Sequence, residues 1–448
     1  MMKKVLPLSL ILFLRFLGLF LVLPVLSVYA LSLEGATPLL VGILVGGYAL
    51  TQAIFQVPFG SMSDKIGRKP TILVGLLIFF AGSIISAYAL MDPTDANSIY
   101  ILMFGRFLQG AGAIGSVIPA MIADVVEEEV RGKAMAMMGG FIAISFAISM
   151  AIGPVIAAHF GIDTIFLITG VLALLGIVIL FTKVPTPPKI KHIYHGKVTT
   201  KDILKDSNLL NMIIINAMQK GLMTMAFVLI PIILTRPEYG FGWDKADLWM
   251  AYVPAMIAGF LAMAPAAILG EKKNIPKQIF LVSIVLFIAA FTIFGFATDS
   301  TVFVVGVVFF FMGFNMMEPL VQSMISKFAR VHQKGAALGI SNSAAYFFTF
   351  LGGTFAGLFL DISNRETLAT VVAGVTVLWF IWTALKLQNP IKHSHLYISQ
   401  DEADLEKLKA LESEHIAEWF INETENVVII KYVSDSMSED ELKVKVAK

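Results

Sequence analysis

The chain has no cysteine and little charge. None of its 448 residues is cysteine, which excludes disulfide bonds, thiolate metal sites, iron–sulfur ligation and cysteine nucleophiles. Charged residues make up 15%, whereas a soluble domain has about 25%. Lys and Arg number 33 and Asp and Glu 32, so the formal net charge of +1 gives no sign of a polyanionic partner such as nucleic acid.

Apolar residues take the place of the missing charges. They make up 57% of the chain, and soluble domains have roughly 45–50%. This excess cannot be buried in one or two soluble cores, so the composition predicts a polytopic membrane protein with the lipid bilayer as its main partner. Residues 393–448 differ from the rest: they hold 13 acids and 6 bases, which predicts a water-soluble tail.

Twelve stretches are long and apolar enough to cross a bilayer as helices, which takes about 20 residues each. They run approximately over 5–30, 39–60, 70–90, 99–124, 133–158, 163–182, 209–234, 246–269, 276–297, 301–325, 336–360 and 367–387. The first stretch could instead be a signal peptide, because Lys3 and Lys4 precede it. It is too long for a signal-peptide core, and its removal would leave eleven spans, so we favour twelve.

Basic residues between the spans predict the orientation. One set of alternate connections holds 21 Lys and Arg, and the opposite set holds only Arg236, Lys245 and Arg365. Basic connections stay on the cytoplasmic side. We therefore expect both termini, the loop at 183–208 and the tail to face the cytoplasm, in a multi-pass protein of the cytoplasmic (inner) membrane.

An internal repeat divides the apolar body. Residues 20–26 resemble residues 227–233, and at the same offset of 207 residues Asp64 meets Glu271. The repeat predicts two parallel six-helix halves, an arrangement suited to alternating access but also open to a duplicated channel or scaffold. The expected units are 1–182 (first bundle), 183–208 (cytoplasmic linker), 209–390 (second bundle) and 395–448 (a small α+β domain).

The connection after the second span carries a motif. It reads Gly60-Ser61-Met62-Ser63-Asp64-Lys65-Ile66-Gly67-Arg68-Lys69-Pro70 and resembles the signature G-x-x-x-D-[RK]-x-G-R-[RK] of the major facilitator superfamily. The resemblance implies a conformational switch that also involves Asp124, as the carboxylate partner of Arg68, and Arg131. Arg68 can form a bidentate pair with a carboxylate. Bases that only set topology would explain Lys65 and Lys69, but not Gly60, Gly67 or Asp64.

Three further segments extend the resemblance, the first to the superfamily as a whole and the other two to its twelve-helix drug/proton antiporter branch. They are Arg106-Phe107-Leu108-Gln109-Gly110, Gly18 through Pro24-Val25-Leu26, and Gly140 to Gly153-Pro154. The last departs from the antiporter pattern, with Ser149 in place of a glycine and Ala157-Ala158 in place of a final glycine pair, so symport stays open beside antiport. The resemblance implies a proton gradient as the energy source, no cofactor, no metal, and a small-molecule substrate that the sequence does not identify.

Four ionisable side chains stand out well inside predicted spans, where charge is expensive and usually functional: Arg15, Arg106, Lys220 and Glu318. Glu318 is the only carboxylate well inside a span, which makes it the candidate proton site. The alternatives are a structural Glu318–Lys220 ion pair or a position without consequence.

The two arginines leave their roles open. Arg106 with Gln109 could shape a central cavity or relay protons, or merely pack its helix. Arg15 could coordinate helix ends or attract an anionic group of the substrate. A hydrophobic pocket is one interpretation, and plain packing the favoured one, for a set of aromatic and methionine residues: Phe141, Phe146, Met223, Met225, Phe227, Tyr252, Phe314, Met316, Met317, Tyr346 and Phe347.

The tail predicts a βαββα order, which resembles the ferredoxin-like domain found on some transporters of this branch. A strand at 396–398 precedes a capping box at Ser399-x-x-Glu402, and 415–422 with 427–433 suggests a hairpin. A short core of this kind makes self-association plausible. His393 and His395 fit a polar linker better than a metal site.

Transport competes with two other classes, a receptor and an enzyme, and export competes with a symporter. A receptor that signals through its tail remains possible, as does a metabolite or sugar symporter. A membrane-embedded enzyme is disfavoured because the sequence has neither Gly-x-Ser-x-Gly nor His-Glu-x-x-His. We therefore expect an all-α membrane transporter with a small soluble domain, and no enzyme.

Overall fold

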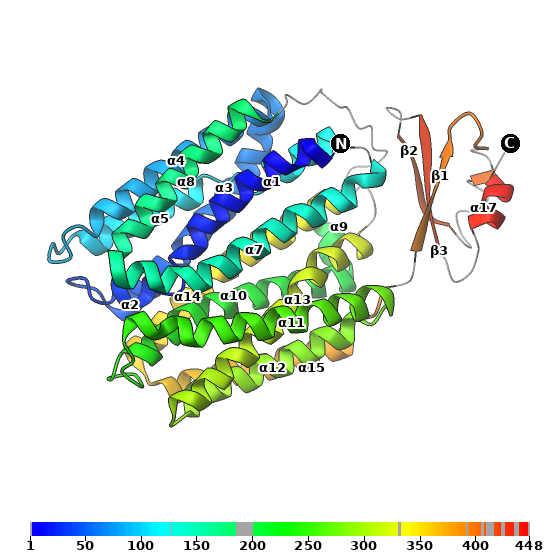
Figure 1. Cartoon of the computed structure of the whole chain (residues 1–448). Coiled ribbons are helices and arrows are strands. Elements are labelled where there is room, and N and C mark those ends of the chain that lie inside the picture. The colour runs from blue at the N-terminus through cyan, green and yellow to red at the C-terminus, as the bar shows by residue number, and fades with distance from the viewer. Residues whose placement is uncertain are drawn as a thin grey trace.

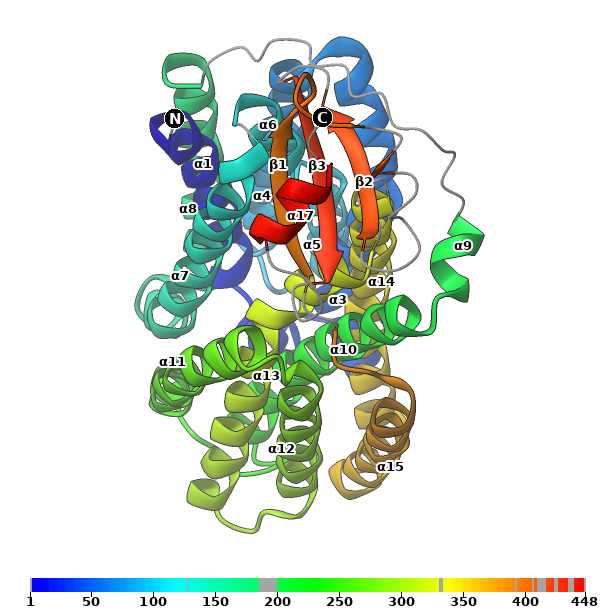
Figure 2. The same ribbon diagram turned by 90° about the vertical axis from the view of Figure 1, so that its right-hand side faces the viewer.

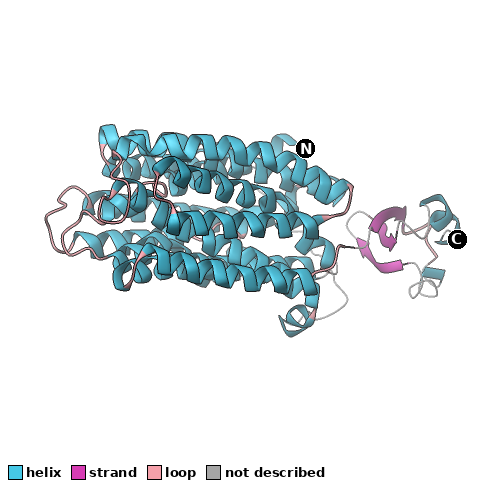
Figure 3. Ribbon diagram, turned by 90° about the horizontal axis from the view of Figure 1, so that it is seen from below, coloured by secondary structure: helices cyan, strands magenta, loops and turns pink. Residues whose placement is uncertain are grey.

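A computed structural model describes residues 2–126, 128–184, 200–329, 333–390, 393–404, 407–408, 416–422, 426–433 and 439–446. Long, nearly parallel helices form the body, and a small sheet lies beyond one end of it (Figures 1 and 3). The helices of the first part are α1 (Met2–Leu21), α2 (Leu26–Ala30), α3 (Pro38–Ile66), α4 (Arg68–Ala89), α5 (Ser98–Ala111), α6 (Val117–Val125), α7 (Glu128–Phe160) and α8 (Ile162–Thr182). Those of the second part are α9 (Thr200–Lys205), α10 (Ser207–Thr235), the 3-10 helix η1 (Lys245–Leu248), α11 (Trp249–Lys272), α12 (Pro276–Phe296), α13 (Ser300–Phe328), α14 (Lys334–Ile362) and α15 (Arg365–Lys386).

Ten of the predicted spans are continuous helices long and apolar enough to cross a membrane. The other two are broken, which the sequence did not lead us to expect. The first span divides into α1 and α2 around Pro24, which has no N–H to donate. The fourth divides into α5 and α6 around residues 112–116, a segment that contains Gly112 and Gly115.

Polar residues fix several helix ends. Asp206 caps α10 by accepting hydrogen bonds from the backbone N–H groups of Asn208 and Leu209, at 2.9 and 3.0 Å. Asp299 caps α13 in the same way through the N–H groups of Thr301 and Val302. These hydrogen bonds, the backbone N–H of Thr301 first among them, lower the pKa of Asp299.

The helices form two bundles, α1–α8 and α10–α15 (Figure 1). Both the start of α1 and the soluble sheet lie at one end, which we call the tail end. The opposite end, with the connections at 31–37, 90–97 and 236–244, is the far end. Figure 2 looks along the bundles from the tail end. The prediction of two six-span halves is confirmed, whereas the side of the membrane on which each end lies stays a prediction.

The two bundles meet tightly at the far end through α3 and α14. A Cβ added to Gly42 would overlap the carbonyl oxygen of Gly353, and one added to Gly46 would lie 2.8 Å from Phe350 Cα. Near the tail end, by contrast, Gly60 on α3 and Gly339 on α14 face open space. The described bundles are therefore in tight contact at the far end, and the positions of Gly60 and Gly339 make no such contact near the tail end.

Hydrogen bonds join the bundles at the far end as well. Ser27 Oγ donates to the Phe227 carbonyl at 3.3 Å. The Nη2 of Arg236 donates to the Val28 carbonyl at 3.3 Å and to Ser32 Oγ at 2.6 Å. These contacts lie between the first span of each half, so the closure at the far end involves two pairs of helices.

The soluble domain is a three-stranded antiparallel sheet with one described helix. The strands are β1 (His393–Ser399), β2 (Ile416–Asn422) and β3 (Val427–Val433), in the order β1-β3-β2, and α17 (Glu439–Val446) follows. Leu396, Ile430 and Leu442 are buried in its core. The predicted hairpin is present, while most of the predicted first helix, including the residues 405, 406 and 409–415, lies outside the described residues.

Candidate functional site

At the tail end, Arg68 holds together the elements of the sequence motif. Its Nε donates to Asp124 Oδ2 at 2.9 Å, and its Nη1 donates to Asp64 Oδ1 at 2.6 Å and to Ser63 Oγ at 2.5 Å. Gly67, between α3 and α4, has φ +102°, a backbone conformation that residues with a side chain rarely adopt. One guanidinium thus ties the ends of α3 and α4 to the end of α6.

The other predicted switch residues are less engaged. Lys69 Nζ donates to the Val184 carbonyl at 2.6 Å, which ties α4 to the end of α8. Lys65 is exposed, and Gly60 faces open space. The side chain of Arg131 lies outside the described residues.

The second bundle has a corresponding polar contact, which no motif in the sequence indicated. Glu271, at the end of α11, accepts hydrogen bonds from Ser323 Oγ and Lys327 Nζ of α13. The repeat had already aligned Glu271 with Asp64, and that alignment was the available signal. Each bundle therefore carries a polar link at the tail end between its second and fourth spans.

In the centre of the first bundle, Arg15 is 1% exposed. Its Nη2 donates to the Gly112 carbonyl at 3.0 Å and to Gln52 Oε1 at 3.3 Å. Its guanidinium lies 5.5 Å from the centre of the Phe79 ring. Arg15 thus contacts the break between α5 and α6 through the Gly112 carbonyl, which also accepts from the backbone N–H of Ile114 at 2.9 Å.

Arg106 lies apart from Arg15 and is fully buried. Its Nη1 donates to Gln109 Oε1 at 2.8 Å, and Gln109 Nε2 donates to Ser83 Oγ at 2.8 Å. The guanidinium is 4.8 Å from the centre of the Tyr48 ring. These contacts join α3, α4 and α5, which supports a packing role for Arg106. A role of Arg106 in relaying protons stays a prediction.

Glu318 and Lys220 form the central ion pair of the second bundle. Lys220 Nζ lies 2.8 Å from both carboxylate oxygens of Glu318, and Gln219 Nε2 donates to Glu318 Oε2 at 3.0 Å. The side chains of Lys220 and Glu318 are 24% and 41% exposed. The predicted Glu318–Lys220 ion pair is thus present, and a role of Glu318 in proton coupling stays a prediction.

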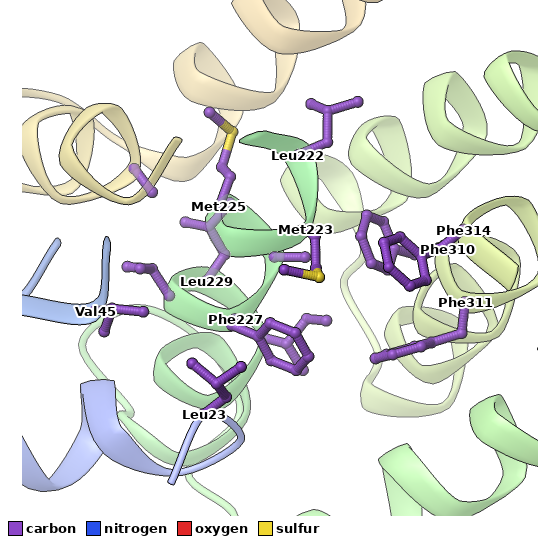
Figure 4. Packing of buried hydrophobic residues seen from close by; sticks show 14 of the residues in the cluster. Leu23, Val45, Leu222, Met223, Met225, Phe227, Leu229, Phe310, Phe311 and Phe314 are labelled. Atoms are coloured by element: carbon purple, nitrogen blue, oxygen red, sulfur yellow. The ribbon is translucent and has the colours of Figure 1, made fainter. Parts of the chain in front are cut away.

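The aromatic and methionine residues mostly pack. Tyr252 and Met317 are fully buried, and Phe347 is 45% exposed. Figure 4 shows Met223 and Phe227 of α10 facing Phe311 and Phe314 of α13. Phe146 of α7 joins the two bundles, with its ring centre 6.0 Å from that of Phe227 and 5.8 Å from that of Phe314.

The glycine motif of α7 divides into two parts. Gly153 packs against the Leu21 carbonyl oxygen, so that α1 and α7 touch where the first span breaks. Pro154 follows it inside α7, while Gly140 faces open space. Ser149, which departs from the pattern, donates to the Leu17 carbonyl at 3.2 Å.

Polar centres buried inside two six-span bundles, which close on each other at one end only, define a membrane transporter built from paired halves. The Major Facilitator Superfamily profile matches residues 8–353 and 241–422. The chain belongs to this family. The family resemblance and the fold inferred from sequence are thereby confirmed.

Relatives and solved structures agree. The inner membrane transport protein YajR of Escherichia coli K12 is 34% identical over 93% of this chain and 91% of its own length. Multidrug resistance protein 2 of Bacillus subtilis is 25% identical over 82% of this chain and 92% of its own. The crystal structure of a D-xylose–proton symporter covers 86% of this chain and 98% of its own, with a TM-score of 0.70 at 15% identity, which supports the fold alone.

We predict that Asp124→Asn will weaken the contact made by Arg68 and lower transport about fivefold or more, because a switch contact contributes about 1–3 kcal/mol to the balance between two conformations. The pair is partly exposed, so the loss of overall stability should stay at about 1 kcal/mol. Transport by reconstituted protein and its melting temperature measure the two effects. Lys273→Gln removes an exposed charge at the same end and should change neither. Equal transport by Asp124→Asn and the parent would argue against the switch.

Proposed function

We propose that the protein is a proton-coupled antiporter that exports small, drug-like molecules by alternating access. The observation that carries this is Glu318, a partly exposed carboxylate beside Lys220 inside a spanning helix. Such residues in transporters usually serve ion or substrate pathways. One of the relatives is named as a multidrug resistance protein, and the similarity of this chain to it supports export. The name describes that relative.

The proposal also assigns a direction. The basic connections support a cytoplasmic position for the tail end, with both termini and the soluble domain. The described conformation, open at the tail end and closed at the far end, is then the one that faces inward. Export would begin here, with substrate entering from the cytoplasm or the inner leaflet before the bundles rock and the tail end closes.

Everted membrane vesicles with an acid interior test the function. Gradient-driven uptake of a lipophilic dye, lost when a protonophore is added, is the expected result. Uptake of a sugar or an amino acid under the reverse gradient would indicate symport. Substrate binding without any flux would indicate a receptor. Vesicles that carry the Glu318→Gln variant serve as the matched control.

A further inference from the structure

Arg15 has more buried hydrogen-bond donors than the described protein has acceptors for. Its Nη2 reaches Gly112 and Gln52, but Nε and Nη1 are buried and have no hydrogen-bond partner among the described residues. An arginine stays charged inside proteins, and leaving donors of a buried cation unpaired is costly. Helix packing alone therefore does not account for this side chain.

Among the residues that the structure describes, no carboxylate is a partner of Arg15. The acids of α1 to α8 lie at helix ends, at Asp64, Asp124, Glu128, Glu129 and Asp163. The titratable groups that face Arg15 are the hydroxyls of Tyr346 and Tyr48. In the second bundle Glu318 already pairs with Lys220. The first bundle thus holds a buried guanidinium with unpaired donors at Arg15, as it does at Arg106, and Arg15 is the one that lies beside the break between α5 and α6.

Other groups around Arg15 also suit an anion. Gly115 lies in the break before the nine-residue helix α6, and a side chain at this position would begin 3.4 Å from Gln52 Nε2 and 3.7 Å from the Tyr346 hydroxyl. Helix N-termini favour negative charge, and in transporters the N-termini of broken helices point at anionic groups of the substrate. The first two amides of α6, those of Val117 and Ile118, already donate to the Ile114 carbonyl, so this helix end contributes its dipole while the guanidinium of Arg15 supplies the unpaired donors.

An aromatic row leads away from this centre. Phe16, beside Arg15, stacks on Phe20 with ring centres 5.3 Å apart, and Phe20 meets Phe146 edge-on at 5.1 Å. Phe146 contacts Phe314, whose ring centre is 4.9 Å from Lys220 Nζ. These rings form a continuous apolar surface between the arginine of one bundle and the ion pair of the other.

We propose that Arg15, with Gln52 and the N-terminus of α6, binds the carboxylate or sulfonate head of an amphipathic aromatic anion whose apolar body lies along Phe16, Phe20 and Phe146. This names a substrate class for the exporter and rests on the proposed function. A monovalent head matches a single guanidinium, because its one negative charge neutralises the one positive charge of Arg15. A lipophilic cation, in contrast, would meet a buried charge of its own sign.

Fluorescent probes that differ only in their head group test the proposal. Dansylglycine carries a carboxylate, dansylglycinamide is its neutral analogue, and both are titrated against the full-length protein in detergent. The acid should bind about tenfold or more tightly than the amide, since one charged contact is worth at least that factor. Arg15→Gln should abolish the preference and leave binding of the amide unchanged. Arg15→Lys should keep part of it, since an ammonium retains the charge but not the planar donors.

Several outcomes would overturn the proposal: equal binding of acid and amide by the parent, an undiminished preference in Arg15→Gln, or competition by chloride or inorganic phosphate as effective as that by dansylglycine. Lys273→Gln, which removes an exposed cation, should behave as the parent does. If Arg15→Gln does not fold, as judged by its melting curve, Arg15→Lys and Gln52→Leu decide, and both should reduce the preference. Binding needs no gradient, so the two proposals fail separately. Tight binding of the acid without flux would contradict only the proposed export. Proton-driven export without a preference for the acid would contradict only the proposed anion site.

Discussion

Glu318→Gln is expected to abolish proton-driven transport while the protein still folds and binds substrate. An amide cannot take up or release a proton, yet it keeps the size of the side chain and can still accept from Gln219 and Lys220. We expect gradient-driven flux in proteoliposomes to fall at least about tenfold and to lose its pH dependence. Exchange of labelled for unlabelled substrate across the membrane without a gradient should persist.

Two variants separate this role from a purely structural ion pair. Glu366→Gln removes a partly exposed acid at the far end and should leave coupling intact. If Glu318 and Lys220 only hold the second bundle together, Lys220→Gln should match Glu318→Gln, and the double variant should restore stability, as a double-mutant cycle reveals. An unchanged pH dependence of transport in Glu318→Gln would remove this residue from the mechanism.

Gly42→Ala is expected to open the far end. The new Cβ would overlap the backbone carbonyl of Gly353, and a backbone contact cannot be relieved by rotating a side chain. Overpacking of this kind costs about 1–3 kcal/mol. The conformation that is closed at the far end should lose population by a factor of about 5–150, and transport should fall with it, because alternating access requires both conformations.

Because the chain has no native cysteine, spin labels attach only to introduced cysteines, and the distances at each end of the bundles can be measured between chosen positions. The pair Thr37→Cys with Ile362→Cys reports the far end, and Ile66→Cys with Ala336→Cys reports the tail end. In Gly42→Ala the first distance should lengthen and the second should shorten. Gly339→Ala, where the added Cβ meets open space, is the matched control. Unchanged distances with normal transport would show that this contact does not set the conformation.

Much of the fold follows from one-dimensional signals. Spans are readable because a bilayer requires about 20 apolar residues in a row, and the repeat is readable because both halves keep the same spacing. The breaks at Pro24 and at 112–116 were missed because a short interruption hardly changes the mean hydropathy of a span. Whether such an interruption kinks a helix or ends it depends on the neighbouring helices.

The candidate site was predictable only where residues lie close in sequence or match a family motif. The resemblance led from Arg68 to Asp124, which lies 56 positions away, and the structure places them 2.9 Å apart. Nothing comparable pointed to Gln52, and Tyr346 was singled out only as an aromatic residue for a hydrophobic pocket; the two lie on helices from different bundles. Ordinary residue types such as Gln and Tyr carry no signal until packing brings them beside a buried cation.

The amino-acid sequence by itself determined that the chain is a membrane-embedded, duplicated helical protein with a soluble tail, and which of its few charged residues lie within the spans. These properties depend on composition and periodicity, because each segment must be apolar along its own length to lie in the bilayer. Only the tertiary structure decided that Arg15 lacks a carboxylate while Lys220 has one, and that the bundles touch at one end. Pairing and closure depend on distances between remote helices, and those distances arise from packing.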